Sequence, residues 1–224
     1  MIKIGVGGSK GKMGSRIIEL AAGDGELELS GSFDMGEDPK PVVEACDCLI
    51  EFTSPEATIE HLALCEEMKK AIVIGTTGLS DEERGKIKEA SKTIPVVCSP
   101  NMSVGVNLLF KMVADAAKVL GPDYAVDIVE AHHAEKKDAP SGTAKEIAQI
   151  VKEAKGDIDV PIESIREDEI VGEHTIKFES DLDVMEITHS AKTRDIFAQG
   201  ALKAAKFLAG KEHGLFTMKD VLGL

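Results

Sequence analysis

The sequence has no surplus of positive charge. Its 224 residues include 26 Lys and Arg against 40 Asp and Glu, which gives a formal net charge of −14 at pH 7. Proteins that bind nucleic acid or anionic membranes without specificity need a positive face, so this balance argues against both classes of partner. An anionic small molecule would have to be held by a local cluster of donors.

Membrane and metal signals are also absent. No apolar run approaches the length of a membrane span, and the start, MIKIGVGGSKGKMG, contains no apolar signal-peptide region. The four cysteines form no C-x-x-C pair, and Cys46 and Cys48 are too close together for an ordinary zinc knuckle. We therefore expect buried, reduced thiols in a cytoplasmic protein, and no metal.

The first hundred residues alternate between strand and helix patterns. Short apolar runs predict strands at 2–6, 27–33, 48–52, 71–74 and 94–98, and helical spacing predicts helices at 13–21, 55–68 and after Ser80. Ser54 with Pro55, and Ser80 with Glu83, are typical helix starts. Alternation of this kind predicts a doubly wound α/β domain with a parallel sheet covered on both faces.

The second half has a different pattern. Helical spacing covers 104–120, 143–154 and 196–208, and strand-like runs cover 125–132, 173–178 and 184–189. Strands now outnumber the helices between them, which predicts an α+β domain with an open sheet. We expect the connections between the two domains near residues 102–103 and 191–192.

A glycine-rich turn follows the first predicted strand. Gly8, Gly11 and Gly14 form a G-x-x-G-x-x-G variant of the dinucleotide fingerprint, in which the helix start faces a pyrophosphate. Asp34 lies 20 residues after Gly14, at the end of the second strand, where a ribose-binding carboxylate is expected. This context favours dinucleotide binding over a plain tight turn, and the absence of G-K-[ST] argues against a P-loop.

The residues near the ribose leave the choice of cofactor open. Asp34 favours NAD, because its carboxylate accepts from a 2′-hydroxyl and repels a 2′-phosphate. Lys10 and Lys12 could supply charge to that phosphate, or could simply be exposed lysines. We therefore expect use of both NADH and NADPH. The loops 75–77 and 99–102 follow strands and could flank the nicotinamide, although ordinary turn chemistry also explains them.

A second cluster of donors lies in residues 130–146, EAHHAEKKDAPSGTAKE. His132 and His133 end a predicted strand, so their side chains should point to opposite faces, which argues against a two-histidine metal site. Lys136 follows in a loop, and Ser141 begins a helix whose N-terminus can hold a carboxylate. This combination suits an acidic substrate that undergoes proton transfer, whereas a solvated loop explains Ser141 alone.

This run resembles the signature of the 4-hydroxy-tetrahydrodipicolinate reductases, the dihydrodipicolinate reductase family of bacterial lysine biosynthesis. Other stretches similar to that family occur in the same order: Gly8 to Gly14, Glu51 to Glu56, Gly75 to Gly78, Asn101 to Asn107, Glu186 to His189 and Gly214 to Leu222. The resemblance implies a Rossmann-like dinucleotide-binding domain at 1–103, completed by 192–224. It also implies a substrate-binding and tetramerisation domain with an open mixed sheet at 104–191.

The resemblance further implies a homotetramer that reduces a cyclic dicarboxylate with NADH or NADPH. By position, His132 is the proton donor and acceptor and Lys136 is the second proton donor. The residues implied to bind substrate are His133, Ser141, Gly142 and Thr143. The residues implied to line the cofactor are Gly8, Ser9, Lys10, Gly11, Lys12, Met13, Asp34, Gly75, Thr76, Thr77, Ser99, Pro100, Asn101 and Met102. Met35 stands where some members have an arginine, and the segment between 154 and 173 is shorter than in long members.

Two other functions stay open on the sequence alone. An amino-acid semialdehyde oxidoreductase would need a nucleophilic cysteine near the nicotinamide, and Cys98 is the only plausible candidate. A redox sensor that binds NAD(H) without catalysis would keep the glycine turn but would not need His132 and Lys136.

Overall fold

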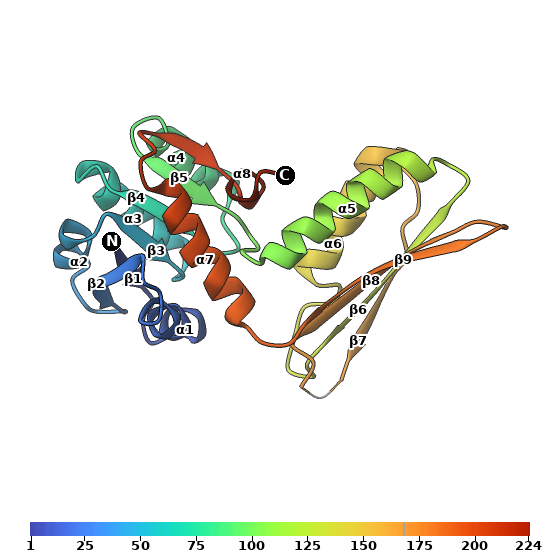
Figure 1. Cartoon of the computed structure of the whole chain (residues 1–224), viewed down its shortest axis with the longest axis horizontal. Helices are drawn as coiled ribbons and strands as arrows, with labels where there is room; N and C mark the ends of the chain where they lie inside the picture. Colours follow the sequence, from blue (N-terminus) through green and yellow to red (C-terminus); the bar gives the residue numbers. More distant parts are fainter. Residues whose placement is uncertain (168) are drawn as a thin grey trace. The chain divides into compact units, whose positions relative to one another are not determined.

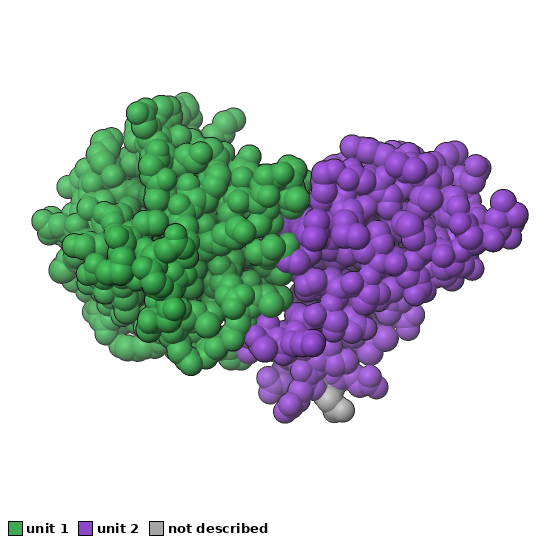
Figure 2. All heavy atoms as spheres, in the orientation of Figure 1, with its two compact units in different colours: residues 1–104, 195–224 green, residues 105–194 purple. Residues whose placement is uncertain are grey.

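The chain divides into two compact units. The structure, a computed structural model, describes residues 1–167 and 169–224. The first unit contains Met1–Val104 and Asp195–Leu224, and the second contains Gly105–Arg194 (Figure 1, Figure 2). Among the described residues, no helix combines the length and apolar character needed to cross a membrane.

The first unit is built on a six-stranded sheet. Its elements are β1 (Ile2–Gly7), α1 (Lys12–Ala21), β2 (Leu27–Phe33), α2 (Lys40–Ala45), β3 (Cys48–Glu51), α3 (Pro55–Glu67), β4 (Ala71–Ile74), α4 (Asp81–Ala90), β5 (Pro95–Cys98), α7 (Asp195–Leu208), β10 (Gly214–Phe216) and α8 (Met218–Leu222). All strands are parallel, in the order β2-β1-β3-β4-β5-β10, which confirms the predicted Rossmann-like sheet. The strand order reverses between β1 and β3, and ligands of such sheets bind beyond the carboxyl ends of the strands at that point.

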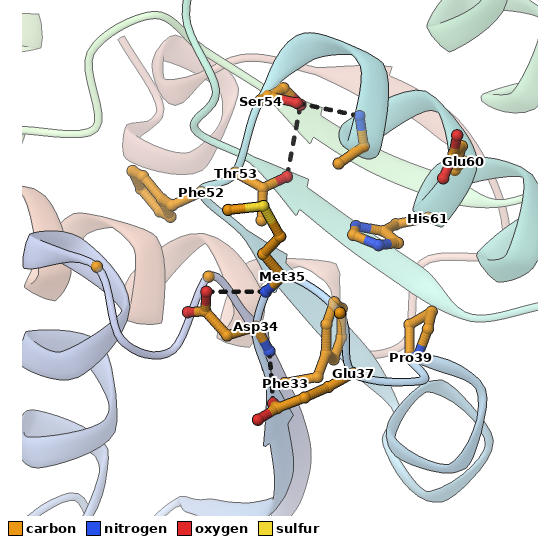
Figure 3. A pocket seen from close by; sticks show the side chains of 14 residues that line it. Phe33, Asp34, Met35, Glu37, Pro39, Phe52, Thr53, Ser54, Glu60 and His61 are labelled. Carbon is orange, nitrogen blue, oxygen red and sulfur yellow. Dashed lines mark hydrogen bonds between the residues drawn. The ribbon is translucent and has the colours of Figure 1, made fainter.

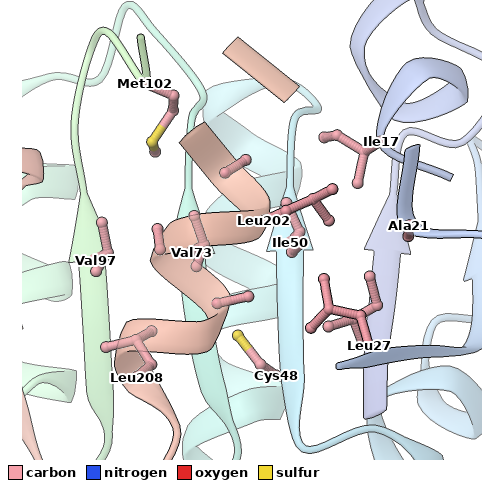
Figure 4. Close-up of a cluster of buried hydrophobic side chains, with 14 of the residues drawn as sticks. Ile17, Ala21, Leu27, Cys48, Ile50, Val73, Val97, Met102, Leu202 and Leu208 are labelled. Atoms are coloured by element: carbon pink, nitrogen blue, oxygen red, sulfur yellow. The ribbon is translucent and has the colours of Figure 1, made fainter. Parts of the chain in front are cut away.

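Apolar layers cover both faces of this sheet, because successive side chains of a strand point to opposite faces. In β3, Cys48 and Ile50 pack against α1 and α7, whereas Leu49 packs in the layer formed by α2, α3 and α4. Figure 4 shows α7 crossing the sheet, with Leu202 and Leu208 over the strands. The expected helix starts are confirmed: Ser54 accepts from the N–H of Ala57, and Ser80 forms a capping box with Glu83.

The second unit has a four-stranded mixed sheet. Its elements are α5 (Val104–Leu120), which begins at the boundary with the first unit, β6 (Ala125–His132), α6 (Gly142–Lys155), β7 (Ile162–Arg166), β8 (Gly172–Glu179) and β9 (Val184–Ala191). The strand order is β7-β6-β8-β9, with β6 and β7 parallel and the other pairs antiparallel. Helices α5 and α6 pack on the same face of this sheet (Figure 1), which confirms the predicted open sheet.

The alternation of β6 positions the candidate site. Val126, Ile128, Glu130 and His132 are all buried, and they follow one another at every second position of the strand. The first two belong to the apolar core under α5 and α6. The last two therefore continue that face as polar groups at the end of the strand.

The sequence prediction missed four short elements. These are α2, β7, β10 and α8, which have 6, 5, 3 and 5 residues. Elements this short contain one or two periods of the hydrophobic pattern, too few to distinguish them from a loop. The omission of β7 matters most, because this strand carries Arg166.

Gly200 provides a test of how α7 packs. A Cβ at this position would lie 1.7 Å from the carbonyl oxygen of Met102. Gly200→Ala should lower the melting temperature, since overpacking costs about 1–3 kcal/mol. Gly85→Ala is the matched control, because Gly85 is exposed in α4 with no atom near the added methyl, and alanine favours a helix by about 1 kcal/mol. Circular dichroism melting curves measure both, and a Gly200→Ala protein as stable as wild type would contradict this packing.

Candidate active site

Glu130 lies at the centre of a buried polar cluster in the second unit. Its side chain exposes 0% of its surface. Nη1 and Nη2 of Arg166 donate to its two oxygens at 3.0 and 2.7 Å, and the N–H of Ser141 donates to Oε1 at 3.2 Å. Nδ1 of His132 lies 2.5 Å from Oε2. Strand register brings these groups together, because His132 pairs with Arg166 on β7 and Glu130 pairs with His174 on β8.

Glu130 stays ionised despite its burial. Burial alone would raise the pKa of this carboxyl, but hydrogen bonds from Arg166, Ser164, His132 and the Ser141 N–H outweigh it and lower the pKa to about 2. A buried charge is stable only when it is paired and hydrogen-bonded, and the fork of Arg166 meets that requirement.

His132 is buried but has space beside one ring nitrogen. Its exposed fraction is 9%, and burial lowers its pKa below the usual value, although Glu130 acts in the opposite direction. Its ring meets that of His174 edge to face, with the centroids 5.1 Å apart. Gly172 faces Nε2 of His132, where a Cβ would lie 3.1 Å away. A side chain at Gly172 would therefore crowd Nε2, and glycine leaves this nitrogen uncovered on that side.

Ser141 holds the start of α6 in place. Its hydroxyl accepts from the N–H of Ala144 at 3.1 Å and lies 3.1 Å from Nε2 of His174. His174 is 4% exposed, and burial lowers its pKa to about 4, so its imidazole is neutral at pH 7. Ser141 is thus engaged inside the protein, and its predicted contact with substrate stays a prediction.

The predicted proton donor Lys136 and the other predicted substrate-binding residues lie near the same helix start. Lys136 is 23% exposed at its side chain, and its Nζ donates to Oδ1 of Asp138 at 2.8 Å. Gly142 is exposed and Thr143 half-buried, in the first turn of α6, and His133 is half-buried directly after β6. Their contacts with a substrate also stay predictions.

Three of these side chains could also suggest a metal site. Glu130, His132 and His174 each offer a ligand atom, all within 4.8 Å of one another. However, the guanidinium of Arg166 already contacts both oxygens of Glu130. A metal ion would have to displace this cation or sit beside it, so the arrangement favours an ion-pair network over a metal centre.

In the first unit, the glycine turn has the shape that a dinucleotide requires. Gly8 has φ +78°, a left-handed conformation that favours glycine. A Cβ on Gly14 would lie 2.1 Å from the carbonyl oxygen of Gly8, so the helix can approach the turn only without a side chain there. Helix α1 starts after Gly11 with no side-chain cap. The backbone N–H groups of its first turn can therefore receive a phosphate.

A hollow of about 540 Å³ opens beside this turn (Figure 3). Its lining residues are Gly8, Gly11, Phe33, Asp34, Met35, Gly36, Glu37, Pro39, Phe52, Thr53, Ser54, Ala57, Glu60 and His61. The backbone N–H groups of Lys10 and Met35 donate to Asp34 at 2.6 and 2.8 Å, and both lower the pKa of its carboxyl. The volume lies within the range of about 300–1,000 Å³ typical of ligand sites.

A second hollow of about 310 Å³ shares Phe52 and Thr53 with the first. Its other lining residues are Met13, Gly75, Thr76, Thr77, Pro100, Asn101, Met102 and Phe197. The two predicted loops after β4 and β5 are thus brought together with the glycine helix. Ser99 is not part of this lining, because it is buried and its hydroxyl donates to the carbonyl of Asn101. Ser9, Lys10 and Lys12 line neither hollow.

The sequence prediction did not include several lining residues, among them His61. Its Nδ1 lies 2.9 Å from Oε2 of the buried Glu51, and its ring meets Phe33 edge to face. Glu51 also accepts from the hydroxyl of Thr53. The only hint of this region in the sequence was that the stretch from Glu51 to Glu56 resembles a motif of the family.

Cys98 does not have the environment of a nucleophile. Burial raises the pKa of its thiol, with a smaller opposite effect from Arg84. A reactive cysteine needs a lowered pKa, so the structure argues against the semialdehyde oxidoreductase.

Known proteins match the chain over both of its units. The family model described as "Dihydrodipicolinate reductase, N-terminus" matches residues 2–102, and the model of the C-terminus matches 105–222. The 4-hydroxy-tetrahydrodipicolinate reductases of Geotalea uraniireducens (strain Rf4) and Trichlorobacter lovleyi are 42% and 43% identical over 266 and 265 aligned positions, which cover all of both chains. These alignments are longer than the 224 residues of the chain, so the relatives contain segments that it lacks.

Solved structures share the fold. The dipicolinate-bound dihydrodipicolinate reductase from Paenisporosarcina sp. TG-14 superposes with a TM-score of 0.86, at 23% identity, over 99% of this chain and 100% of that one. A probable dehydrogenase from Thermotoga maritima gives a TM-score of 0.64 at 14% identity, over 99% of this chain and 93% of that one. Family models over both units and relatives above 40% identity along the full length show that this chain belongs to the dihydrodipicolinate reductase family.

Proposed function

We propose that the chain catalyses the NAD(P)H-dependent reduction of 4-hydroxy-tetrahydrodipicolinate to tetrahydrodipicolinate, in diaminopimelate and lysine biosynthesis. The relatives carry the name of this activity, and a solved relative is described with dipicolinate, a cyclic dicarboxylate. The observation that carries the proposal is the pair of proton-transfer groups at and after the end of β6. His132 lies on its ion-pair network, and the charge of Lys136 acts on its imidazole. The four free cysteines support a cytoplasmic location, which cell fractionation would test.

The first unit would hold the cofactor. The turn from Gly8 to Gly14 suits the pyrophosphate, and Asp34 suits the hydroxyls of the adenosine ribose. The second hollow, beside Thr76, Thr77 and Asn101, suits the nicotinamide ring. When bound, the reduced nicotinamide supplies the hydride.

The second unit would bind the substrate and supply protons. The first turn of α6, at Gly142 and Thr143, offers N–H groups and the positive end of the helix dipole to one carboxylate. Lys136 and His133 add donors for the same dianion. Loss of the 4-hydroxyl group as water would first give a conjugated ring. Addition of a hydride to that ring leaves an electron-rich enamine, which requires a proton at carbon, for which we assign His132, and stabilisation at nitrogen, for which we assign Lys136.

Turnover tests this assignment. Wild-type protein should lose reduced-nicotinamide absorbance only when freshly generated substrate is present. His132→Gln and Lys136→Met should each lower kcat by about 10²- to 10⁴-fold, because each removes a proton donor. Cofactor affinity, measured by quenching or calorimetry, should not change. Lys137→Met is the matched control, since this neighbouring lysine is exposed and we assign it no role. Cofactor binding without wild-type turnover would favour the sensor, and full turnover in both variants would refute the site.

We also propose that NADH is the better of the two cofactors. Nζ of Lys10 pairs with Oε1 of Glu37 at 2.7 Å, and Oε2 of Glu37 accepts from the N–H of Asp34 at 2.8 Å. The lysine charge that could attract a 2′-phosphate is thereby neutralised beside an acidic hollow. Met35, which is 94% exposed, adds no charge at the position where some family members have an arginine.

Replacing Glu37 should shift this preference. Glu37→Gln should raise the ratio of kcat/KM for NADPH to that for NADH by about two- to fivefold, which is the effect of an exposed ion pair worth roughly 0.5–1 kcal/mol. Glu44→Gln, which removes an exposed charge from α2 outside the hollow, is the control. Initial rates with both cofactors measure the ratio. An unchanged ratio would show that Glu37 does not set the preference.

We propose a homotetramer that assembles through the uncovered face of the mixed sheet. On this face the β6 side chains of Val129 and Ala131 are half-buried, and Thr175 bonds Thr188 across β8 and β9 at 2.9 Å. The same face carries the charged side chains of Asp127, Lys177 and Glu186, which are register neighbours on β6, β8 and β9. Among the described residues no helix packs on this face, so it is open to association with another chain. Light scattering should give four times the 23.9 kDa of one chain, and a monomer would contradict the assembly.

A further inference from the structure

Among the described residues of the second unit, Arg166 and Glu130 each take part in several hydrogen bonds, yet neither has a role in the proposed reaction. We propose that they are positioning residues for proton transfer: Glu130 fixes the tautomer of His132 so that Nε2 exchanges the proton, and Arg166 holds both Glu130 and the loop that carries Lys136. This inference rests on the proposed function and deepens it.

The tautomer follows from the partners of Glu130. Its Oε1 accepts from Nη2 of Arg166 and from the N–H of Ser141, and its Oε2 accepts from Nη1 of Arg166. A carboxylate in these contacts carries no proton, so it can only accept from His132. Nδ1 of His132 is therefore the donor, and Nε2, the nitrogen that faces Gly172, is left to give or take a proton.

The orientation of the ring follows from contacts on two sides. Nδ1 is held by Glu130 from the same strand, two residues earlier, and the ring edge meets His174 from the neighbouring strand β8. Rotation of the imidazole about its own axis would break the first contact. Orientation of this kind is what a carboxylate behind a catalytic histidine provides in other proton-transfer sites.

Arg166 links the two assigned proton donors. Its Nη2 donates to Oε1 of Glu130 and also to the backbone carbonyl of Asp138, each at 2.7 Å. The side chain of Asp138 accepts from Nζ of Lys136. One guanidinium thus fixes the carboxylate behind His132 and the backbone of the loop beside Lys136. The planar fork of arginine can reach both oxygens of Glu130 and the carbonyl of Asp138 at once, whereas the single ammonium of a lysine could not contact all three.

The charges of Glu130 and Arg166 affect the pKa of His132, so their removal should shift the pH dependence of activity. The charged or titratable groups that face His132 are Glu130 on β6, Arg166 on β7, His174 on β8 and Lys136 in the loop. Among the groups that shift the pKa of His132, Glu130 raises it, whereas burial, Lys136 and Arg166 lower it. Loss of the Glu130 charge should therefore lower this pKa further. Since reduction needs the protonated imidazole, activity should then decline at a lower pH than in wild type.

The experiment uses the full chain and four variants, one of them a control. Glu130→Gln keeps the volume of the side chain and should lower kcat by about 10- to 100-fold, with the KM for substrate and the affinity for NADH within about threefold of wild type. As the pH is raised, kcat/KM of this variant should begin to decline at a lower pH than that of wild type. Arg166→Lys keeps the charge and should retain more activity than Arg166→Met. Lys118→Gln, which removes an exposed charge from α5, should match wild type in kcat and pH profile.

A double variant separates positioning from folding. Arg166→Met alone leaves a buried carboxylate without its main partner and is expected to destabilise the unit. Glu130→Gln with Arg166→Met removes both charges and should recover the melting temperature. Under the proposal, kcat stays low and the pH profile stays shifted in this stable protein. Recovery of kcat together with stability would overturn the proposal and make the pair purely structural.

Nitrogen NMR of His132 provides a test that needs no turnover. In neutral wild-type protein, Nδ1 should carry the proton and Nε2 should not. The opposite tautomer would overturn the inference, whatever the kinetics. Absence of wild-type turnover would refute the proposed function, while the NMR result would still decide how Glu130 holds the ring.

Discussion

The second unit depends on keeping one buried charge satisfied. Glu130 has no exposed surface, and an unpaired carboxylate in such a place would cost several kcal/mol. Its partners come from β6 itself, from β7 and from the start of α6. The need to compensate this charge therefore fixes the end of β6, which carries His132, against β7 and against the start of α6. The loop that carries Lys136 connects β6 to that helix start.

Most of the fold could be predicted because it rests on local patterns. Short apolar runs predicted β1 to β5 with shifts of about one residue at their ends, and the caps at Ser54 and Ser80 are formed as expected. The glycine turn was recognised because its steric requirements leave a signature in residue type. In the second unit, the alternation in β6 correctly indicated that His132 and His133 lie in different environments.

The remaining site residues depend on contacts between distant parts of the chain. Arg166 is 36 positions from Glu130, on a five-residue strand whose residues are mostly half-buried, so no periodic pattern indicated either the strand or its partner. His174 pairs with Glu130 only because β8 is antiparallel to β6 in one register. The burial of Glu130 could have been predicted from the sequence, since the same alternation that buries His132 also buries the residue two positions before it.

Asp34 and Glu130 show how the remaining hydrogen-bonding capacity of a carboxylate separates a binding role from a positioning role. A carboxylate can accept about four hydrogen bonds. Asp34 is half-buried at the edge of a hollow and accepts from two backbone N–H groups, so it retains capacity for the hydroxyls of a ligand. Glu130 is enclosed, and Arg166, Ser141, His132 and Ser164 already donate to its two oxygens. It has no capacity left for a substrate, and it can therefore influence the reaction only through the groups it holds.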